Sequence, residues 1–192
     1  MSLYTEHVRR WGKCRLCDLC NGRTKVVLAR GQVPCDVMCL GEAPGPSEDI
    51  IGLPFIGPAG KLLDRMIQQA GAGITDWDMA PLRLAFTNLV ACMPTGEDGK
   101  KFAEPPKEAI QACAPRLAEF VDLAKPKLIV CVGTLAKKYK HKNWTTVDII
   151  HPAAIMRMDV SQQGLAIQRT IVVLNDAFCE PLFQQEPSNG PR

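Results

Sequence analysis

The chain has 192 residues, of which 46% are hydrophobic, and a formal net charge of +3. This length and composition allow one substantial core, and length alone favours a single domain. A net charge this small does not by itself indicate a polyanionic partner such as a nucleic acid. A local cluster of basic residues on one face is still compatible with it. No apolar run approaches the length of a membrane span and the first residues lack a secretory signal, so we expect a soluble, cytoplasmic protein.

We expect residues 1–185 to form the domain and residues 186–192 to be a flexible tail. The segment up to residue 30 carries three cysteines, Cys14, Cys17 and Cys20, among Arg and Lys residues. Its apolar periodicity is too weak for a core element. The segment therefore predicts an N-terminal clip held by cysteines.

Short apolar runs bounded by Gly, Pro or polar residues alternate along the rest of the chain with stretches of helical periodicity. The runs predict strands over 36–40, 82–88, 127–133, 145–150 and 169–174. The periodic stretches predict helices over 57–71, 107–126, 134–140 and 175–185. Alternation of this kind indicates an α/β protein with a parallel sheet that is covered on both faces.

Polar residues follow three of the predicted strands directly: the loop 41–49 (GEAPGPSED), the pair Thr87-Asn88 and the pair His151-Pro152. Open α/β sheets bind ligands at the carboxyl ends of their strands. We therefore expect these three polar elements to meet in one crevice, although they lie far apart in the sequence.

Nine cysteines in a cytoplasmic chain argue against a disulfide framework and for metal binding or simple burial. Cys14 and Cys17 form a C-x-x-C pair, and Cys92 and Cys113 supply two further sulfurs. Four thiolates can hold zinc or an iron–sulfur cluster, and the wide spacing of the second pair favours a cluster. Alternatively, Cys92 and Cys113 are small buried residues, and Cys20 is a further candidate ligand. Burial is the expectation for Cys35, Cys39, Cys131 and Cys179.

The loop 41–49 has two interpretations. Its glycines allow the backbone to approach a ligand closely, and Glu48 or Asp49 could hold a water molecule or stabilise positive charge. Alternatively it is a solvated turn in which Ser47, Glu48 or Asp49 caps a helix. Taken by itself, the loop favours the solvated turn.

Three other side chains are candidates for a site, and each has a structural alternative. Phe55 lies among glycines and next to Pro54, where a fixed ring could stack on a planar ligand or simply fill the core. Asn88 could read the edge of an amide-like ligand or close a turn. Few carboxylate residues lie near His151 in the sequence, which is more typical of a structural histidine than of a catalytic one.

Six segments, taken in order, make the chain resemble the iron–sulfur uracil-DNA glycosylases, family 4 of the uracil-DNA glycosylase superfamily. They cover most of residues 11–158 and read CRLCDLCNGRTKVV, DVMCLGEAPGPSEDIIGLPFIGPAGKLLDRM, FTNLVACMP, EAIQACAPRLAEF, PKLIVCVGTLAKK and HPAAIMR.

This resemblance implies a three-layer α/β/α sandwich around a mostly parallel four-stranded sheet, a [4Fe–4S] cluster, and hydrolysis of the N-glycosidic bond of deoxyuridine in single- or double-stranded DNA. It implies a monomer, associated with the nucleoid, with a replication or repair protein as a further candidate partner. The implied catalytic residues are Glu48, His151 and Glu42, the substrate-binding residues Ala43, Phe55 and Asn88, the DNA contacts Ile155, Met156 and Arg157, and the cluster ligands Cys14, Cys17, Cys92 and Cys113.

Within that resemblance, Phe55 stacks on the extruded uracil, Asn88 bonds its N3 and O4, and His151 bonds its O2. Ala43 departs from the pattern, because some branches of the superfamily carry a catalytic aspartate there; Glu48 would then position the water without that carboxylate. The loop between Cys92 and Cys113 is longer than usual, and the segment before His151 is shorter. Two alternatives remain: a DNA-binding accessory protein with altered catalysis, and a glycosylase for another deaminated base.

Overall fold

The centre of the protein is a five-stranded sheet. The structure is a computed structural model that describes residues 2–71, 82–95 and 103–179. The strands run in the order β1-β3-β2-β4-β5, and all neighbours are parallel except β1, which pairs antiparallel with β3. The strands are β1 (Arg30–Gly31), β2 (Val37–Gly41), β3 (Leu84–Asn88), β4 (Leu128–Val132) and β5 (Thr146–Ile149). The predicted four parallel strands are present, and β1 adds a short edge strand that was not predicted.

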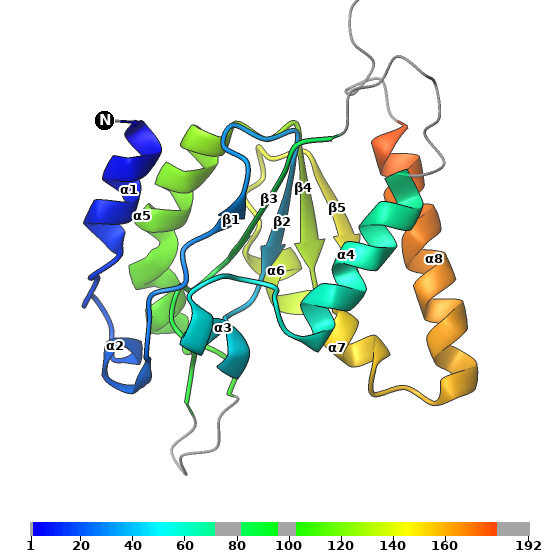
Figure 1. The fold of residues 1–192 in the computed structure, drawn as a ribbon, viewed down its shortest axis with the longest axis horizontal. Helices are drawn as coiled ribbons and strands as arrows, with labels where there is room; N and C mark the ends of the chain where they lie inside the picture. The colour runs from blue at the N-terminus through cyan, green and yellow to red at the C-terminus, as the bar shows by residue number, and fades with distance from the viewer. Residues whose placement is uncertain (1, 72–81, 96–102, 180–192) are drawn as a thin grey trace, which may run out of the picture.

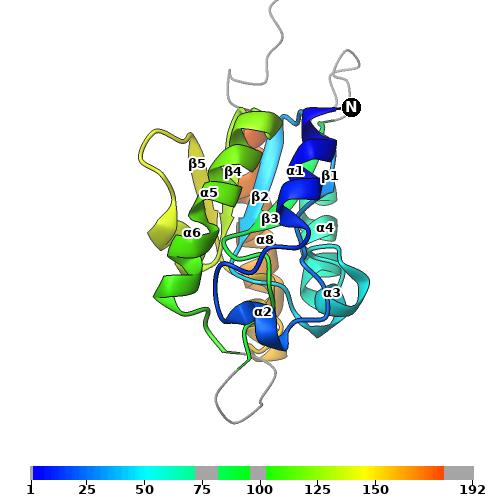
Figure 2. The ribbon, with the colours of Figure 1, turned by 90° about the vertical axis from the view of Figure 1, so that its left-hand side faces the viewer.

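Helices cover both faces of this sheet, as the α/β/α prediction requires. Figures 1 and 2 show α1 and α5 on one side, with α4 and α8 on the other. No helix within the described ranges is long and apolar enough to cross a membrane. The helices are α1 (Leu3–Trp11), α2 (Leu19–Gly22), α3 (Pro46–Ile51), α4 (Pro58–Gly71), α5 (Lys107–Ala124), α6 (Thr134–Tyr139), α7 (Pro152–Ile155) and α8 (Val160–Phe178).

The strands divide their side chains between two apolar cores. Along β2, Met38 and Leu40 pack toward α5, whereas Val37 and Cys39 pack toward α4 and α8. Alternate residues of a strand face opposite sides of a sheet, so a strand that is apolar throughout must be covered twice. The continuous apolar runs of the sequence therefore specify the layered fold.

The prediction of a strand over 169–174 is wrong, because these residues belong to α8. Its β-branched residues suggest a strand, but the buried positions Thr170, Leu174, Ala177 and Phe178 follow helical spacing. Val172 and Val173 point outward, 56% and 39% exposed. Intrinsic propensity is weak compared with the packing of one helical face, and here packing decides. The predicted helix over 175–185 is correct as far as Phe178, and residues 180–185 lie outside the described ranges, as does the predicted tail at 186–192.

The N-terminal segment contains a helix that the sequence did not reveal. The buried residue of α1 is His7, a polar residue, so apolar periodicity gave no signal. Its Nδ1 lies 3.0 Å from Glu119 Oε1 on α5, and its ring packs near Phe120. Arg10 and Trp11 donate to the other oxygen of Glu119. These polar contacts with Glu119 attach α1 to α5. They thereby hold Cys14 and Cys17, which follow α1, close to the sheet.

Candidate active site and cysteine pocket

A cleft lies at the carboxyl ends of the parallel strands, where the sequence predicted a crevice. Its walls come from the ends of β2, β3, β4 and β5 and from the loop that links α3 to α4. Of the predicted site residues, the cleft brings together Glu42, Ala43, Glu48, Phe55, Asn88, His151 and Arg157. Met156 is exposed, but Ile155 is fully buried in the core. Ile155 therefore packs in the core beside the site. The resemblance implied that Ile155 contacts DNA, and its burial does not favour such a contact.

Phe55 and Asn88 approach each other above Gly41. Gly41 at the end of β2 pairs with Asn88 at the end of β3. A Cβ atom on Gly41 would overlap both Asn88 Oδ1 and Phe55 Cζ. The ring of Phe55 is backed by Phe86, with the two centroids 5.8 Å apart. A flat ring beside an amide side chain suits a planar ligand that stacks on one and bonds the other.

Glu48 holds the loop that carries Phe55. Its Oε1 accepts hydrogen bonds from the backbone N–H groups of Ile56 and Gly57, at 3.0 and 2.7 Å. Its Oε2 makes no hydrogen bond to the described part of the chain. One carboxylate oxygen is thus committed to the loop, and the other remains for a ligand in the cleft.

Asp49, the other acidic candidate in the loop, faces away from the cleft. It is 3% exposed, and its carboxylate accepts hydrogen bonds from the backbone N–H of Thr24 at 2.9 Å. Asp49 therefore ties α3 to the N-terminal segment. The N-terminus of α3 has no side-chain cap, so the capping interpretation of the loop is wrong; the loop forms one wall of the cleft instead.

His151 is the N-cap residue of α7, and its Nε2 makes no hydrogen bond to the described part of the chain. Its Nδ1 accepts a hydrogen bond from the backbone N–H of Ala153 at 3.1 Å, so Nδ1 carries no proton in this arrangement. Burial, helped by the nearby Arg157 cation, holds the pKa of His151 below its ordinary value. The neutral ring then carries its proton on Nε2, where it can act as a donor.

Glu42 is half-buried in the same cleft. Burial, and then the carboxylate of Glu104, raise the pKa of Glu42 above its usual range. Lys137, in the last turn of α6, also lines the cleft, although sequence reasoning did not single it out. The available signal was a pair of lysines in the short helix that follows a buried strand.

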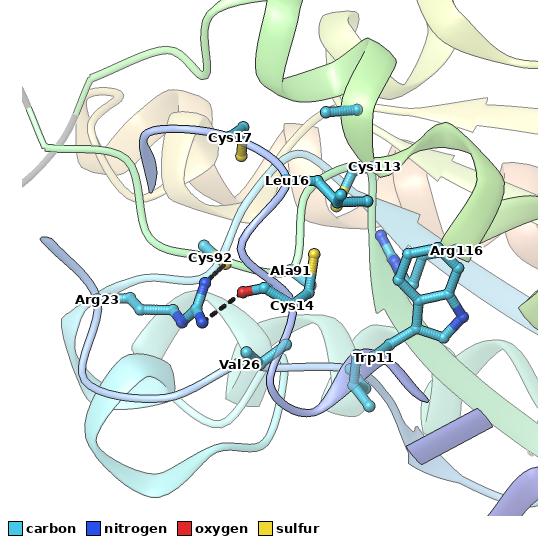
Figure 3. A pocket seen from close by; sticks show the side chains of 12 residues that line it. Trp11, Cys14, Leu16, Cys17, Arg23, Val26, Ala91, Cys92, Cys113 and Arg116 are labelled. Carbon is cyan, nitrogen blue, oxygen red and sulfur yellow. Dashed lines mark hydrogen bonds between the residues drawn. The ribbon is translucent and has the colours of Figure 1, made fainter. Parts of the chain in front are cut away.

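The four cysteines of the predicted ligand set line a second pocket, between the N-terminal segment and α5 (Figure 3). Cys14 and Cys17 follow α1, Cys92 follows β3, and Cys113 lies on α5. In the described ranges, no group of three or more ligating side chains is arranged to hold a single metal ion. Cys20 is not part of the pocket lining and hydrogen-bonds Asn21 instead.

Two arginines that the sequence did not flag lie at this pocket. Arg23 donates to Cys92 Sγ at 3.2 Å and to the carbonyl oxygen of Cys14 at 2.5 Å (Figure 3). Burial raises the pKa of the Cys92 thiol to about 11, and the hydrogen bond from Arg23 opposes that rise. A bound metal would reverse this balance, because coordination deprotonates a thiol.

Arg116 is buried beside the same cysteines, one helical turn beyond Cys113, and is 1% exposed. It donates to Thr87 Oγ1 and to the carbonyl oxygens of Asn88 and Leu89, at 2.8, 2.5 and 2.9 Å. Its Nε has no partner, and no carboxylate of the described ranges pairs with it. Arg116 is thus a buried cation that connects the cysteine pocket to the end of β3.

The remaining cysteines mostly behave as expected. Cys35, Cys39 and Cys131 are buried in the two cores. Cys179 is exposed, so its predicted burial is wrong. It lies directly after the last residue of α8, beyond the helical face that packs on the core.

Comparison with known proteins agrees with the fold and the cleft. The family model of the uracil DNA glycosylase superfamily matches residues 29–172. A type-4 uracil-DNA glycosylase from Archaeoglobus fulgidus is 30% identical over 180 residues, which cover 81% of this chain and 84% of the relative. The chain therefore belongs to the uracil-DNA glycosylase superfamily and, within it, to the type-4 family.

Two further relatives carry the same name. The type-4 uracil-DNA glycosylase of Saccharolobus solfataricus is 34% identical over 142 residues, or 74% of this chain. That of Sulfurisphaera tokodaii is 36% identical over 126 residues, or 66% of this chain. The chain spans only 59% and 52% of the lengths of these two relatives.

We predict that Gly41→Ala blocks the cleft without unfolding the protein. The added methyl group would displace Phe55 or Asn88, so uracil release from DNA should fall by at least about tenfold. The matched control is Gly164→Ala on α8, where a Cβ meets nothing within 4 Å. This control should keep full activity and gain slightly in melting temperature. Normal uracil release by Gly41→Ala would show that the ring and the amide do not meet at Gly41.

Proposed function

We propose that the protein hydrolyses the N-glycosidic bond of deoxyuridine in DNA, releasing uracil and leaving an abasic site. The observation that carries this proposal is the meeting of Phe55 and Asn88 above Gly41, with His151 in the same cleft. The names of the type-4 relatives support the same reaction.

Base recognition in this proposal depends on stacking and on one amide. Uracil inside a duplex is out of reach, so the base must be extruded or taken from single-stranded DNA. Phe55 then stacks on its face. The Asn88 amide offers an acceptor to N3–H and a donor to O4, whereas cytosine presents the opposite pattern at these positions. A nearly fully buried amide makes that mismatch costly, because its polar groups would lack partners.

His151 acts on the leaving group. Cleavage of the glycosidic bond places negative charge on the departing uracil and positive charge on the sugar. The Nε2–H of neutral His151 donates to uracil O2 and stabilises that anion. Because the bond from Ala153 fixes the ring and its tautomer, no reorganisation is needed as the charge develops.

Glu48 positions the attacking water in this proposal. Its Oε1 is held by two backbone donors, which fixes the carboxylate and directs Oε2 to the ligand. The fixed negative charge also offsets the cationic sugar. Ala43 supplies no second carboxylate beside it, so Glu48 does this alone, with Glu42 as the next acidic group of the cleft.

DNA would lie across the mouth of the cleft. Met156 is 45% exposed directly after α7 and can enter the base stack. Arg157 and Lys137 line the cleft and suit contacts with phosphate. The protein would act as a monomer on single- or double-stranded DNA.

We further propose that Cys14, Cys17, Cys92 and Cys113 hold a [4Fe–4S] cluster. Four cysteine sulfurs that line one pocket suit a cluster bound by four thiolates. Arg23 at Cys92 and the buried Arg116 favour an anionic group there. When bound, the cluster would cross-link the N-terminal segment, the end of β3 and α5. Hydrolysis transfers no electrons, so a structural role suffices.

A direct assay tests the reaction. Purified protein should release uracil from a uracil-containing oligonucleotide, seen as strand breaks after alkali, and should leave a hypoxanthine-containing one intact. Asn88→Ala should lower kcat/KM by about 10–100-fold, through loss of the edge hydrogen bonds. Cleavage of the hypoxanthine substrate alone would point to another deaminated base. Tight DNA binding without cleavage would identify an accessory protein, the alternative that the short segment before His151 leaves open.

The cluster assignment predicts a coloured protein. As-purified protein should contain iron and sulfide in equal amounts and absorb visible light. Cys14→Ala should lose both the colour and several degrees of melting temperature. Cys20→Ala is the matched control and should keep them, because Cys20 lies off the pocket. Colourless protein that contains zinc would contradict the assignment.

Because neutral His151 is the form that donates from Nε2, we predict that the reaction rate declines on the acid side of the pH–rate profile (the acid limb). Its pKa lies below the ordinary value of 6.5, so the ring is neutral above that lowered pKa and the rate should fall as pH falls through it. The unfolded chain takes up this proton near 6.5 and the folded protein does not, so the contribution of His151 to stability also declines below that pH. His151→Gln should be slower and should lack the limb in kcat/KM. A limb that persists in His151→Gln would assign the titration to Glu42, whose pKa is raised by burial.

A further inference from the structure

Phe55 has a backbone conformation that phenylalanine rarely adopts. Its φ is +57°, in the left-handed region that favours glycine. Such a residue keeps this conformation only when its surroundings enforce it, and such strain is often found at binding sites. The contacts that enforce it therefore control the position of the ring.

Arg30 on β1 makes two of these contacts from a single side chain. Its Nε donates to the carbonyl oxygen of Pro54 at 2.8 Å, and its Nη2 donates to that of Phe55 at 3.3 Å. Nη2 also bonds Asp64 Oδ1 on α4 at 2.6 Å. One guanidinium thus joins the edge strand, the loop and α4.

The same guanidinium also backs the aromatic pair. Arg30 is the direct cross-strand partner of Phe86, and its Cζ lies 3.7 Å from the centroid of that ring. Phe86 in turn packs against Phe55. Arg30, Phe86 and Phe55 form a continuous row of contacts, in which the two rings are tilted by 54°, and Phe55 lines the cleft. The antiparallel strand β1 places Arg30 at this position.

We propose that Arg30 is a positioning residue for base binding: it clamps the 54–55 backbone and supports Phe55 through Phe86. This inference rests on the proposed function, because it assigns Phe55 as the surface on which the base stacks. Glu48 holds the far side of the same loop through Ile56 and Gly57. Without Arg30 the loop would relax toward a commoner backbone conformation, and each binding event would have to restore it.

Lysine cannot replace Arg30 in this role. An ammonium has no planar face to stack on Phe86, and it cannot bond two carbonyl oxygens and a carboxylate in the fixed geometry of a guanidinium. Arg30→Lys nevertheless keeps the positive charge. The variant therefore removes the clamp while it leaves the long-range attraction to DNA.

The test is a double-mutant cycle of Arg30→Lys with Phe55→Ala on a single-stranded uracil substrate. Arg30→Lys should raise KM and the inhibition constant of free uracil about tenfold, with kcat changed much less. In the Phe55→Ala background the same change should have almost no further effect. Additive losses in an active protein would overturn the proposal. A fall in kcat at unchanged KM would do the same, because it indicates partial unfolding.

Amide hydrogen exchange tests the clamp without substrate. The N–H groups of Ile56 and Gly57 should exchange faster in Arg30→Lys than in the wild type. Unchanged exchange would overturn the clamp whatever the activity. Absence of uracil release by the wild type would defeat the proposed function, while this measurement would still decide on Arg30.

Two further variants complete the design. Arg83→Lys is the matched control, because Arg83 is also paired with a carboxylate, Asp36, but lies just before β3, at the amino ends of the strands and away from the cleft. It should change neither KM nor the exchange of the loop. Arg30→Met tests whether Arg30 instead binds a phosphate of the DNA backbone. If this variant lowers the slope of log affinity against log salt concentration by about 1, Arg30 contacts a phosphate and the proposal fails.

Discussion

The site depends on the register between two parallel strands, β2 and β3. Gly41 lies opposite Asn88, so the amide stands beside the one position on β2 that leaves room for the ring of Phe55. A shift of one residue would turn Asn88 to the other face of the sheet, because side chains alternate along a strand. The apolar residues of β2 fix that register, since each must enter one of the two cores. Core packing and base recognition are therefore specified by the same residues.

Arg116 extends this constraint to the cysteine pocket. It bonds the carbonyl groups of Asn88 and Leu89 from behind, where the chain leaves the sheet toward Cys92. A buried guanidinium without a carboxylate partner is costly unless its hydrogen bonds and a nearby negative charge compensate it. Thiolates or a cluster in the pocket would provide that charge. The pocket and the cleft would then lie on two sides of the same strand end, and the proposed cluster would stabilise Asn88 without taking part in the reaction.

The sequence predicted the parallel strands and the cleft because those features depend on short-range patterns. Continuous apolar runs followed by Gly, Asn or His identify strand ends, and topology places such ends together. The prediction failed where tertiary contacts decide. The β-branched run in α8 resembled a strand, and only its packing on α4 makes it a helix. α1 is attached through His7 and Glu119, a polar contact between residues more than a hundred positions apart. The sequence analysis singled out neither Arg30 nor Arg116, because only their contacts reveal their roles.

The loop GEAPGPSED illustrates how a local pattern can be ambiguous and still become definite in the fold. Its two neighbouring acidic residues diverge: Asp49 is buried against Thr24, and Glu48 turns to the cleft and holds the Phe55 loop. A carboxylate with one oxygen bonded to two amides is fixed more firmly than a solvated one, and fixed charge is what transition-state stabilisation requires. Arg30 on one side and Glu48 on the other thus hold the same turn, residues 54–57. In the absence of a carboxylate at position 43, the proposed activation of water would depend on the fixed orientation of Glu48.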